Sequence, residues 1–538
     1  MLPISTQPEL KKIFDRVVHH AAEFDRILPE MRFFVLDSRE FTSLLNKSVY
    51  PTSPVNIWEG KDVISQRNRQ DTGQESSIYY EVVQTGRPSY AYLNDTNSLT
   101  MQASVMAHVV GHCEFSELNV MHDSNDDRTE YVMYLVRKVE RSRHQMGDPV
   151  YQAYWNACES IVPLIAPNSQ FSLAWSVENE SEMSTAREPE EGADSRLSLP
   201  YSSTMESLLG NRREEHSASE VVAKRNLRQE TLSRKGYKLR APCQDIFGFL
   251  RRYAPASTAE RNILEYLYTT HQTHDFVMRT QIMNEGWAMY WEKAIMHELF
   301  REGTVKGMIE YAKSVSGVCY PRPFYQRNPY SLGFHMWNHI EQLYRDGKVS
   351  LDYVEETDMQ RKVTWKKPTG DDPREAMRHL VKTVTDYEFL RRFLTPEVIW
   401  ETYLNRVPKQ HVRQLGLEAR DIVKEDQHYV YIEPEPVKEE MLGFFTHFHR
   451  PRIYVIDNDF MDGGLLLFHR DDGKPLRQDW INPTLRNLNL IWKAPVSLLS
   501  RDTLYSYSTN SYKETKTAVP SFETALERMQ SSEKPFRL

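Results

Sequence analysis

The sequence lacks most features that mark secreted, membrane-spanning or nucleic-acid-binding proteins. Its four cysteines are widely spaced and form no C-x-x-C pair, so we expect reduced thiols in a cytoplasmic protein rather than a disulfide framework. No apolar run reaches the length of about 18 residues that a membrane span needs, and residues 1–10 do not resemble a signal peptide. The net charge is −8 without a long basic run, so a nucleic-acid partner is not expected.

Motifs of several common enzyme classes are also missing. The chain has no Walker pattern and no G-x-G-x-x-G, so no nucleotide cofactor is expected. It has no G-x-S-x-G elbow of the kind that presents a catalytic serine. The segment Asp462-Gly463-Gly464 is typical of a hairpin turn, not of a phosphate-binding loop. The sequence patterns that still indicate a chemical function are those of metal-ligating residues.

The length and composition predict a folded protein of several domains. A chain of 538 residues is too long for one hydrophobic core, so we expect two or three domains. The 10 tryptophans, 29 tyrosines and 22 phenylalanines indicate large buried surfaces. Apolar periodicity predicts helices over 100–112, 128–146, 258–268, 275–300, 333–344 and 371–405. It predicts strands over 32–36, 89–93, 428–432, 453–456, 465–468 and 496–499.

These patterns predict an α+β fold with a mostly helical main body and a small C-terminal α/β domain. We divide the chain into an N-terminal α+β part (1–175), a polar insert (176–235), a helical part (236–408), the C-terminal α/β domain (409–507) and a polar, mobile tail (508–538). The insert is rich in Ser, Glu, Arg and Asn and poor in aromatics, which is typical of disorder. A solvated helical excursion is the alternative interpretation of the insert.

The first candidate metal-binding pattern is Ala107-His108-Val109-Val110-Gly111-His112. Histidines four residues apart on a helix point the same way, about 5–6 Å apart at Cβ. A carboxylate from another helix would complete a His₂Glu site, with a fourth position open to water. Two structural histidines on a helix are the alternative, and the chain has a second pair with the same spacing, His335 and His339.

The second pattern is Met283-Asn284-Glu285-Gly286-Trp287-Ala288-Met289-Tyr290-Trp291. Its E-G-W-A-x-Y segment resembles the helix that supplies the third ligand in some gluzincin peptidases, where the glutamate binds zinc. This resemblance implies a gluzincin-like site made by His108, His112 and Glu285. Zinc is the expected metal at a nitrogen-rich site, and iron and manganese are alternatives. The aromatic residues of this segment are expected in the core rather than in a cleft.

The general base of a zinc hydrolase is not evident. In H-E-x-x-H the base is the glutamate after the first histidine, but here that position is Val109. Glu114, Glu117 and Glu292 are candidates, each either as base or as an orienting group behind the ligands. Glu292 lies two helical turns after Glu285, on about the same face. Ordinary solvated carboxylates are the alternative for each of them.

Three further histidines lie near Glu285 in the sequence. His274 and His297 are weaker candidates for extra ligands, and His271 lies beside them. Most single histidines in proteins are not metal ligands, so we do not include these three in the predicted site.

Several ordered blocks together resemble the stage V sporulation protein R (SpoVR) family. They are Thr100–His112, Asp245–Pro255, Gln281–Ala288 and Asn328–Phe334, together with the C-terminal hairpin module. Residues 270–274, Glu292 and residues 115–119 depart from the family pattern, so the chain resembles a divergent member. The resemblance covers most of the chain apart from the insert and the tail.

The resemblance implies a process rather than a reaction. It points to sporulation, the spore cortex, cell-wall peptidoglycan or a stress response, and to a serine protein kinase and a von Willebrand-type protein as partners. Two classes of function remain open. One is a zinc-dependent hydrolase-like protein that lacks the usual base. The other is a non-catalytic regulatory or assembly protein, in which the motif residues are structural.

Overall fold

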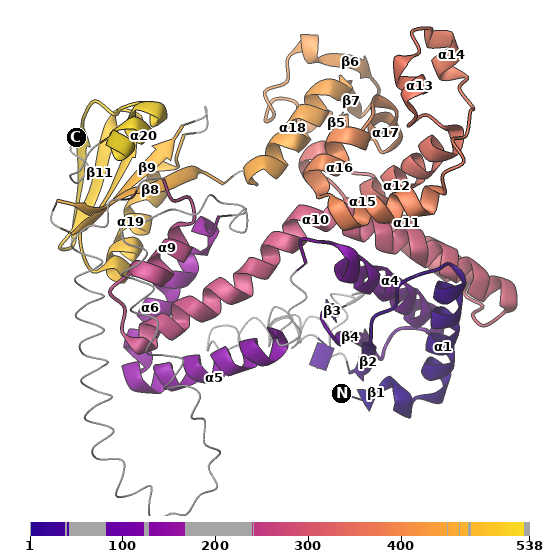
Figure 1. The fold of residues 1–538 in the computed structure, drawn as a ribbon, viewed down its shortest axis with the longest axis horizontal. Coiled ribbons are helices and arrows are strands. Elements are labelled where there is room, and N and C mark those ends of the chain that lie inside the picture. Colours follow the sequence, from indigo (N-terminus) through magenta and orange to yellow (C-terminus); the bar gives the residue numbers. More distant parts are fainter. Residues whose placement is uncertain are drawn as a thin grey trace, which may run out of the picture. The chain divides into compact units, whose positions relative to one another are not determined.

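The computed structural model describes residues 2–37, 40–41, 82–122, 128–166, 239, 242–448, 450–461, 463–471 and 475–531. Within these ranges the fold is mixed α and β, mostly helical with a few small sheets, as the sequence predicts (Figure 1). The insert predicted over residues 176–235 lies outside the described residues. No described helix is both long enough and apolar enough to cross a membrane.

The chain forms two compact units, residues 1–133 with 276–448 and residues 134–275 with 449–538. Two helices cross this division, α5 (Arg128–Met146) and α10 (Thr258–Glu302). The sequence predicts two helices where α10 is one continuous helix of 45 residues. The range 409–507, which the sequence groups as one C-terminal domain, contributes residues 409–448 to the first unit and 449–507 to the second.

The first unit begins with a four-stranded sheet of order β1-β2-β4-β3. The strands are β1 (Leu2–Pro3), β2 (Met31–Leu36), β3 (Val82–Gln84) and β4 (Ser89–Asn94). β2 and β4 are parallel, and both strands confirm the sequence prediction. Helices α1 (Pro8–Glu23) and α4 (Leu99–Leu118) pack together in a core that also includes residues of this sheet.

The main core of this unit is built around tryptophans. Trp287, Trp291 and Trp337 are fully buried, and the Trp287 ring makes edge-on contacts with the other two. They lie on α10 and on α12 (Pro329–Asp346). The other described α-helices that lie wholly in this unit are α11 (Met308–Val318), α13 (Leu351–Glu355), α14 (Met359–Val363), α15 (Pro373–Thr383), α16 (Asp386–Phe393), α17 (Pro396–Glu401) and α18 (Pro434–His447). A small sheet of order β5-β7-β6 (Arg406–Pro408, Tyr429–Ile432, Ile422–Glu425) completes the unit.

The second unit contains a five-stranded sheet of order β12-β11-β10-β9-β8. Its strands are β8 (Arg452–Phe460), β9 (Gly464–Arg470), β10 (Val496–Ser500), β11 (Thr503–Ser508) and β12 (Ser511–Lys516). β8 and β9 form the predicted antiparallel hairpin, and β10 runs parallel to β9. The helices of this unit include α6 (Asp148–Ser160), α9 (Ile246–Tyr253), α19 (Gln478–Trp492) and α20 (Phe522–Ser531).

The C-terminal region is more regular than its polar composition suggests. The sequence predicts a polar, mobile tail from residue 508, but β12 pairs along its whole length with β11. Helix α20 follows, with Ala525 and Met529 buried. Edge-strand pairing and two apolar anchors thus order part of a segment whose average hydropathy is low.

Candidate metal centre

Helix α4 carries both motif histidines and is buried over almost its whole length. The Ser98 side chain caps its N-terminus by accepting a hydrogen bond from the Met101 N–H. Residues 100–116 are all buried, which is typical of a helix that is surrounded by other elements. His108 and His112 lie on one face with ring centroids 4.6 Å apart, as four-residue spacing requires.

Glycines let α4, α10 and α12 approach closely enough to bring the ligands together. A Cβ on Gly111 would lie 2.6 Å from the Ala288 Cα, and a Cβ on Gly333 would lie 2.7 Å from the Gly286 Cα. Real side chains do not reach such separations, so each of these positions needs glycine. The glycines of the three sequence blocks therefore set the distance between the helices, not the chemistry of the site.

The structure brings His108, His112 and Glu285 to one point. Glu285 Oε2 lies 3.5 Å from His108 Nε2 and 3.3 Å from His112 Nε2. These separations exceed those of ordinary N–H···O hydrogen bonds, about 2.7–3.2 Å. Ligands about 2.0–2.2 Å from a tetrahedral zinc ion are about 3.3–3.5 Å apart, so Glu285 Oε2 is spaced from each Nε2 atom as metal ligands are. All three ligand atoms lie within 4.8 Å of one another.

Hydrogen bonds behind the two histidines fix which ring nitrogens face Glu285. His108 Nδ1 lies 2.8 Å from Glu292 Oε2, and Glu292 Oε1 accepts a 2.6 Å bond from the Ser104 hydroxyl. His112 Nδ1 lies 2.8 Å from Asn284 Oδ1. Because each Nδ1 faces an acceptor, it carries the proton in the neutral ring, and each Nε2 presents a lone pair to Glu285. A carboxylate or amide behind a metal-binding histidine is a common arrangement.

The electrostatics of Glu285 follow from its burial beside two imidazoles. Burial alone would raise the pKa of the carboxyl, but the charges of His112 and His108 and their Nε2–H hydrogen bonds, when both rings are protonated, outweigh burial and hold the pKa below its usual range. When the two rings are neutral, their Nε2 lone pairs face the carboxylate instead. A buried carboxylate in that arrangement is costly without a cation or added protons.

Glu114 and Glu117, two of the candidate bases, are engaged elsewhere. Both oxygens of the buried Glu114 accept hydrogen bonds, from the Ile27 N–H, Trp287 Nε1 and the Arg26 guanidinium at 3.1, 3.0 and 3.3 Å. Glu117 forms an ion pair with Arg87. Of the candidate carboxylates, Glu292 is the one in direct contact with a ligand histidine.

Among the other histidines named from the sequence, those whose side chains the structure describes do not join this centre. His271 Nδ1 lies 2.8 Å from the Leu267 carbonyl oxygen of its own helix, and His297 is exposed beside Glu298. The side chain of His274 lies outside the described residues. His335 and His339 are on α12, and His339 Nε2 is 3.5 Å from the Thr395 hydroxyl.

A small pocket adjoins the centre on the His108 side. Its volume is about 20 Å³, and its polar wall is formed by Ser104, His108, Glu292, Ser314 and Tyr330. Val105, Met289, Val315 and Val318 are among its apolar lining residues. A volume of this size accommodates roughly one or two water molecules.

Sequence reasoning missed one buried group that supports the centre. Asp386, at the start of α16, accepts hydrogen bonds from the Ile282 and Met283 N–H groups of α10 at 2.8 and 2.9 Å. It therefore holds the turn of α10 immediately before Glu285. Complete burial raises the pKa of Asp386 to about 8. The two residues are about a hundred positions apart, and no local pattern links them.

Comparison with known proteins identifies the family. The model of the SpoVR like protein family matches residues 5–440, which include both motif segments. The chain belongs to this family. It is also 26% identical over 408 residues to the uncharacterized protein YcgB of Escherichia coli (strain K12), which covers 72% of this chain and 73% of that protein. No solved structure matches the chain. The family resemblance seen in the sequence is thus confirmed.

Proposed function

We propose that this SpoVR-family chain binds a divalent metal ion, zinc by preference, through His108, His112 and Glu285, and acts as a metal-dependent hydrolase-like protein. The observation that carries the proposal is the spacing of the three ligand atoms. Glu285 Oε2 is 3.3 and 3.5 Å from the two Nε2 atoms, a separation expected between ligands of one ion.

The protonation pattern supports the same conclusion. With both Nδ1 protons directed at Glu292 and Asn284, neutral histidines would place two lone pairs beside the Glu285 carboxylate. Such a cluster of electron pairs is stabilised by a cation, either a divalent metal or added protons. Histidine nitrogens with one carboxylate are a ligand set that zinc favours.

The proposed chemistry is that of a metal with an open position. A divalent ion with three protein ligands lowers the pKa of a bound water and polarises a carbonyl group. His108, His112 and Glu285 would hold the ion, and Glu292 would keep the His108 ring in its ligating orientation. Ser104 in turn holds Glu292. The pocket of about 20 Å³ beside His108 leaves room for water in this conformation.

The biological setting of the proposal comes from the family. We propose a role in sporulation, spore-cortex or cell-wall peptidoglycan processes or a stress response, in the cytoplasm, with a serine protein kinase and a von Willebrand-type protein as partners. These elements rest on the family resemblance alone.

One set of observations favours a second function, a non-catalytic regulatory or assembly protein. Val109 occupies the position of the base glutamate, and Glu114 and Glu292 both use their two oxygens in hydrogen bonds to other residues. A metal without a neighbouring base would serve to stabilise the helices that hold it.

Metal analysis of tag-free protein tests the proposal. We expect close to one bound divalent ion per chain at the buried centre, lost in His112→Ala and in Glu285→Gln. His339→Ala is a matched control, because His335 and His339 repeat the spacing but form no three-ligand group with the other described residues, and it should retain the metal. Wild-type protein that binds no more metal than His112→Ala would refute the site.

A second measurement separates the two functions. Metal-loaded wild-type protein and Glu285→Gln are compared for release of products from peptidoglycan and from peptide libraries. Activity that depends on Glu285 supports the hydrolase-like function. Full metal loading without hydrolysis of either substrate supports the regulatory or assembly function.

A further inference from the structure

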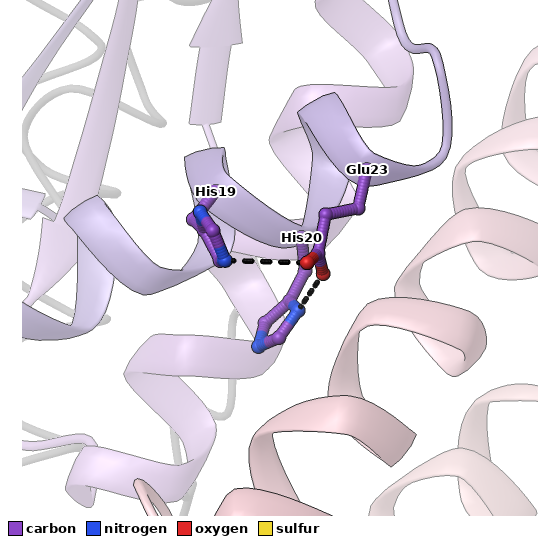
Figure 2. A group of neighbouring side chains, drawn as sticks. All are labelled: His19, His20 and Glu23. Atoms are coloured by element: carbon purple, nitrogen blue, oxygen red, sulfur yellow. Dashed lines mark hydrogen bonds and ion pairs between the residues drawn. The ribbon is translucent and has the colours of Figure 1, made fainter.

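A second group of metal-ligating side chains lies at the end of helix α1, outside the centre described above. His19, His20 and Glu23 each offer one ligand atom, and these atoms all lie within 4.8 Å of one another. Figure 2 shows both imidazoles beside the Glu23 carboxylate. His19 Nε2 is 3.3 Å from Glu23 Oε1, and His20 Nδ1 is 2.8 Å from Glu23 Oε2.

We propose that His19, His20 and Glu23 form a second divalent transition-metal site, independent of the buried centre. The ligand set is again two imidazoles and one carboxylate, which suits zinc, cobalt(II) or nickel(II). Helical spacing brings His19 and Glu23 together at i and i+4, and His20 and Glu23 at i and i+3. The side chains of His19 and Glu23 are half exposed, so the site is open to ions in solution.

The outer nitrogen of His20 is held as it would be in a metal site. His20 Nε2 lies 3.1 Å from Glu302 Oε2, at the C-terminus of α10, and 3.3 Å from Arg16 Nη2. Nδ1 is therefore the nitrogen that faces Glu23 and the proposed ion. Glu302 is itself fixed by the guanidinium of Arg16, whose Nε is 3.1 Å from both carboxylate oxygens. A carboxylate behind a histidine orients the ring and makes it a stronger ligand.

The charge around the group also favours a dication. Arg16 and Glu302 form an ion pair, which leaves the Glu23 carboxylate as the unneutralised charge of the group. The group occupies the last turn of α1, where the helix dipole places partial negative charge.

The expected consequence is a metal-dependent connection within the first unit. The ion would tie the end of α1 through His20 and Glu302 to the end of α10, which also carries Glu285. The site therefore differs from the buried centre in location and in access to solvent, and neither depends on the other for its ligands.

Zinc titration of the tag-free, full-length, chelator-stripped protein by calorimetry tests the proposal. His19→Ala should bind one zinc ion fewer than the wild type. His19 is half exposed, so this variant should fold normally, and its unchanged circular dichroism spectrum would show it. His297→Ala is the matched control, an exposed histidine beside a glutamate on α10, and it should bind as much zinc as the wild type.

Two further variants separate this proposal from the buried centre. His112→Ala should lose one zinc ion and keep the α1 site, and the His19→Ala, His112→Ala double variant should lose both. If His112→Ala binds as much zinc as the wild type while His19→Ala binds one ion fewer, the proposed function fails and the α1 site stands. Glu302→Gln should keep the stoichiometry and weaken zinc binding at α1 about 10- to 100-fold. Equal zinc stoichiometry in His19→Ala and wild type would overturn the proposal.

Discussion

Gly286 and Gly333 face each other where α10 crosses α12, so closely that neither position has room for a Cβ atom. A Cβ on Gly333 would lie 2.7 Å from the Gly286 Cα, and the same contact seen from Gly286 is tighter still. The crossing fixes the position of α10 at Gly286, one residue after Glu285. A change at this contact is therefore expected to act on the fold and on the candidate metal centre together.

Gly286→Ala should destabilise the protein by roughly 1–3 kcal/mol, because overpacking forces the two helices apart. It should also weaken metal binding, since Glu285 would move away from the histidines of α4. Gly317→Ala on α11 is the matched control, because a Cβ there meets nothing within 4 Å. That variant should be as stable as the wild type or more stable by up to about 1 kcal/mol. Denaturant unfolding of both variants and metal titration check this, and equal stability of the two would contradict it.

Glu292→Gln should weaken metal binding at the buried centre by about 10- to 100-fold. The reason is the loss of the charged acceptor that fixes the Nδ1 proton of His108. Ser104→Ala, which removes one hydrogen bond to Glu292, should have a smaller effect in the same direction. Competition with a chromogenic chelator measures the affinity. Glu298→Gln on the same helix should leave the affinity unchanged, and a Glu292→Gln affinity equal to that of Glu298→Gln would count against the positioning role.

Asp386 should make stability depend on pH. Its pKa is about 8 in the folded protein and near the ordinary value of 3.8 when unfolded. The folded state therefore holds the proton more tightly, so this contribution is fully present below pH 3.8 and is lost as pH rises through 8. The stability of wild type relative to Asp386→Asn, which cannot ionise, should fall between pH 4 and pH 8. Urea unfolding across this range in excess chelator measures it, and a constant difference would show that Asp386 does not titrate.

Chelator should lower the melting temperature of metal-loaded protein. An ion that binds the folded state at a concentration 100-fold above its Kd adds about 2.7 kcal/mol to the free energy of unfolding. Because the protein has two units, the loss of stability should appear in the unfolding transition of the first unit, which holds the three ligands. Differential scanning calorimetry with and without chelator records it. In the His19→Ala background, which lacks the proposed α1 site, His112→Ala should melt at nearly the same temperature in both conditions. Chelator-sensitive melting of this double variant equal to that of His19→Ala would argue against a coupled site at the buried centre.

The sequence predicted the parts of the centre that depend on helical spacing and on the family blocks. His108 and His112 share a face of α4 because they are four residues apart, and Glu292 lies on about the same face as Glu285 because it is seven residues further along α10. Their mutual contact could not be predicted from spacing alone, because it depends on how three glycines let the helices approach.

Other supporting groups gave no local signal. Asp386 reaches α10 from about a hundred residues away. The His19, His20 and Glu23 group was not identified from the sequence, and its link to Glu302 joins residues 282 positions apart. The strand and helix beyond residue 508 were hidden by polar composition, because edge strands and exposed helices expose most of their side chains.

Three consecutive residues of α10 contact two neighbouring helices, α4 and α12. Asn284 accepts from His112, Glu285 faces both histidines, and Gly286 contacts Gly333. Successive residues on a helix are about 100° apart around its axis, so the contacts of these three residues take up most of the circumference of this turn. Insertion or deletion of a single residue in this turn would rotate all three away from their partners at once. We therefore expect relatives to differ in length in their loops and not in this turn. An unchanged spacing from Asn284 to Glu292 would then identify the relatives that keep the centre.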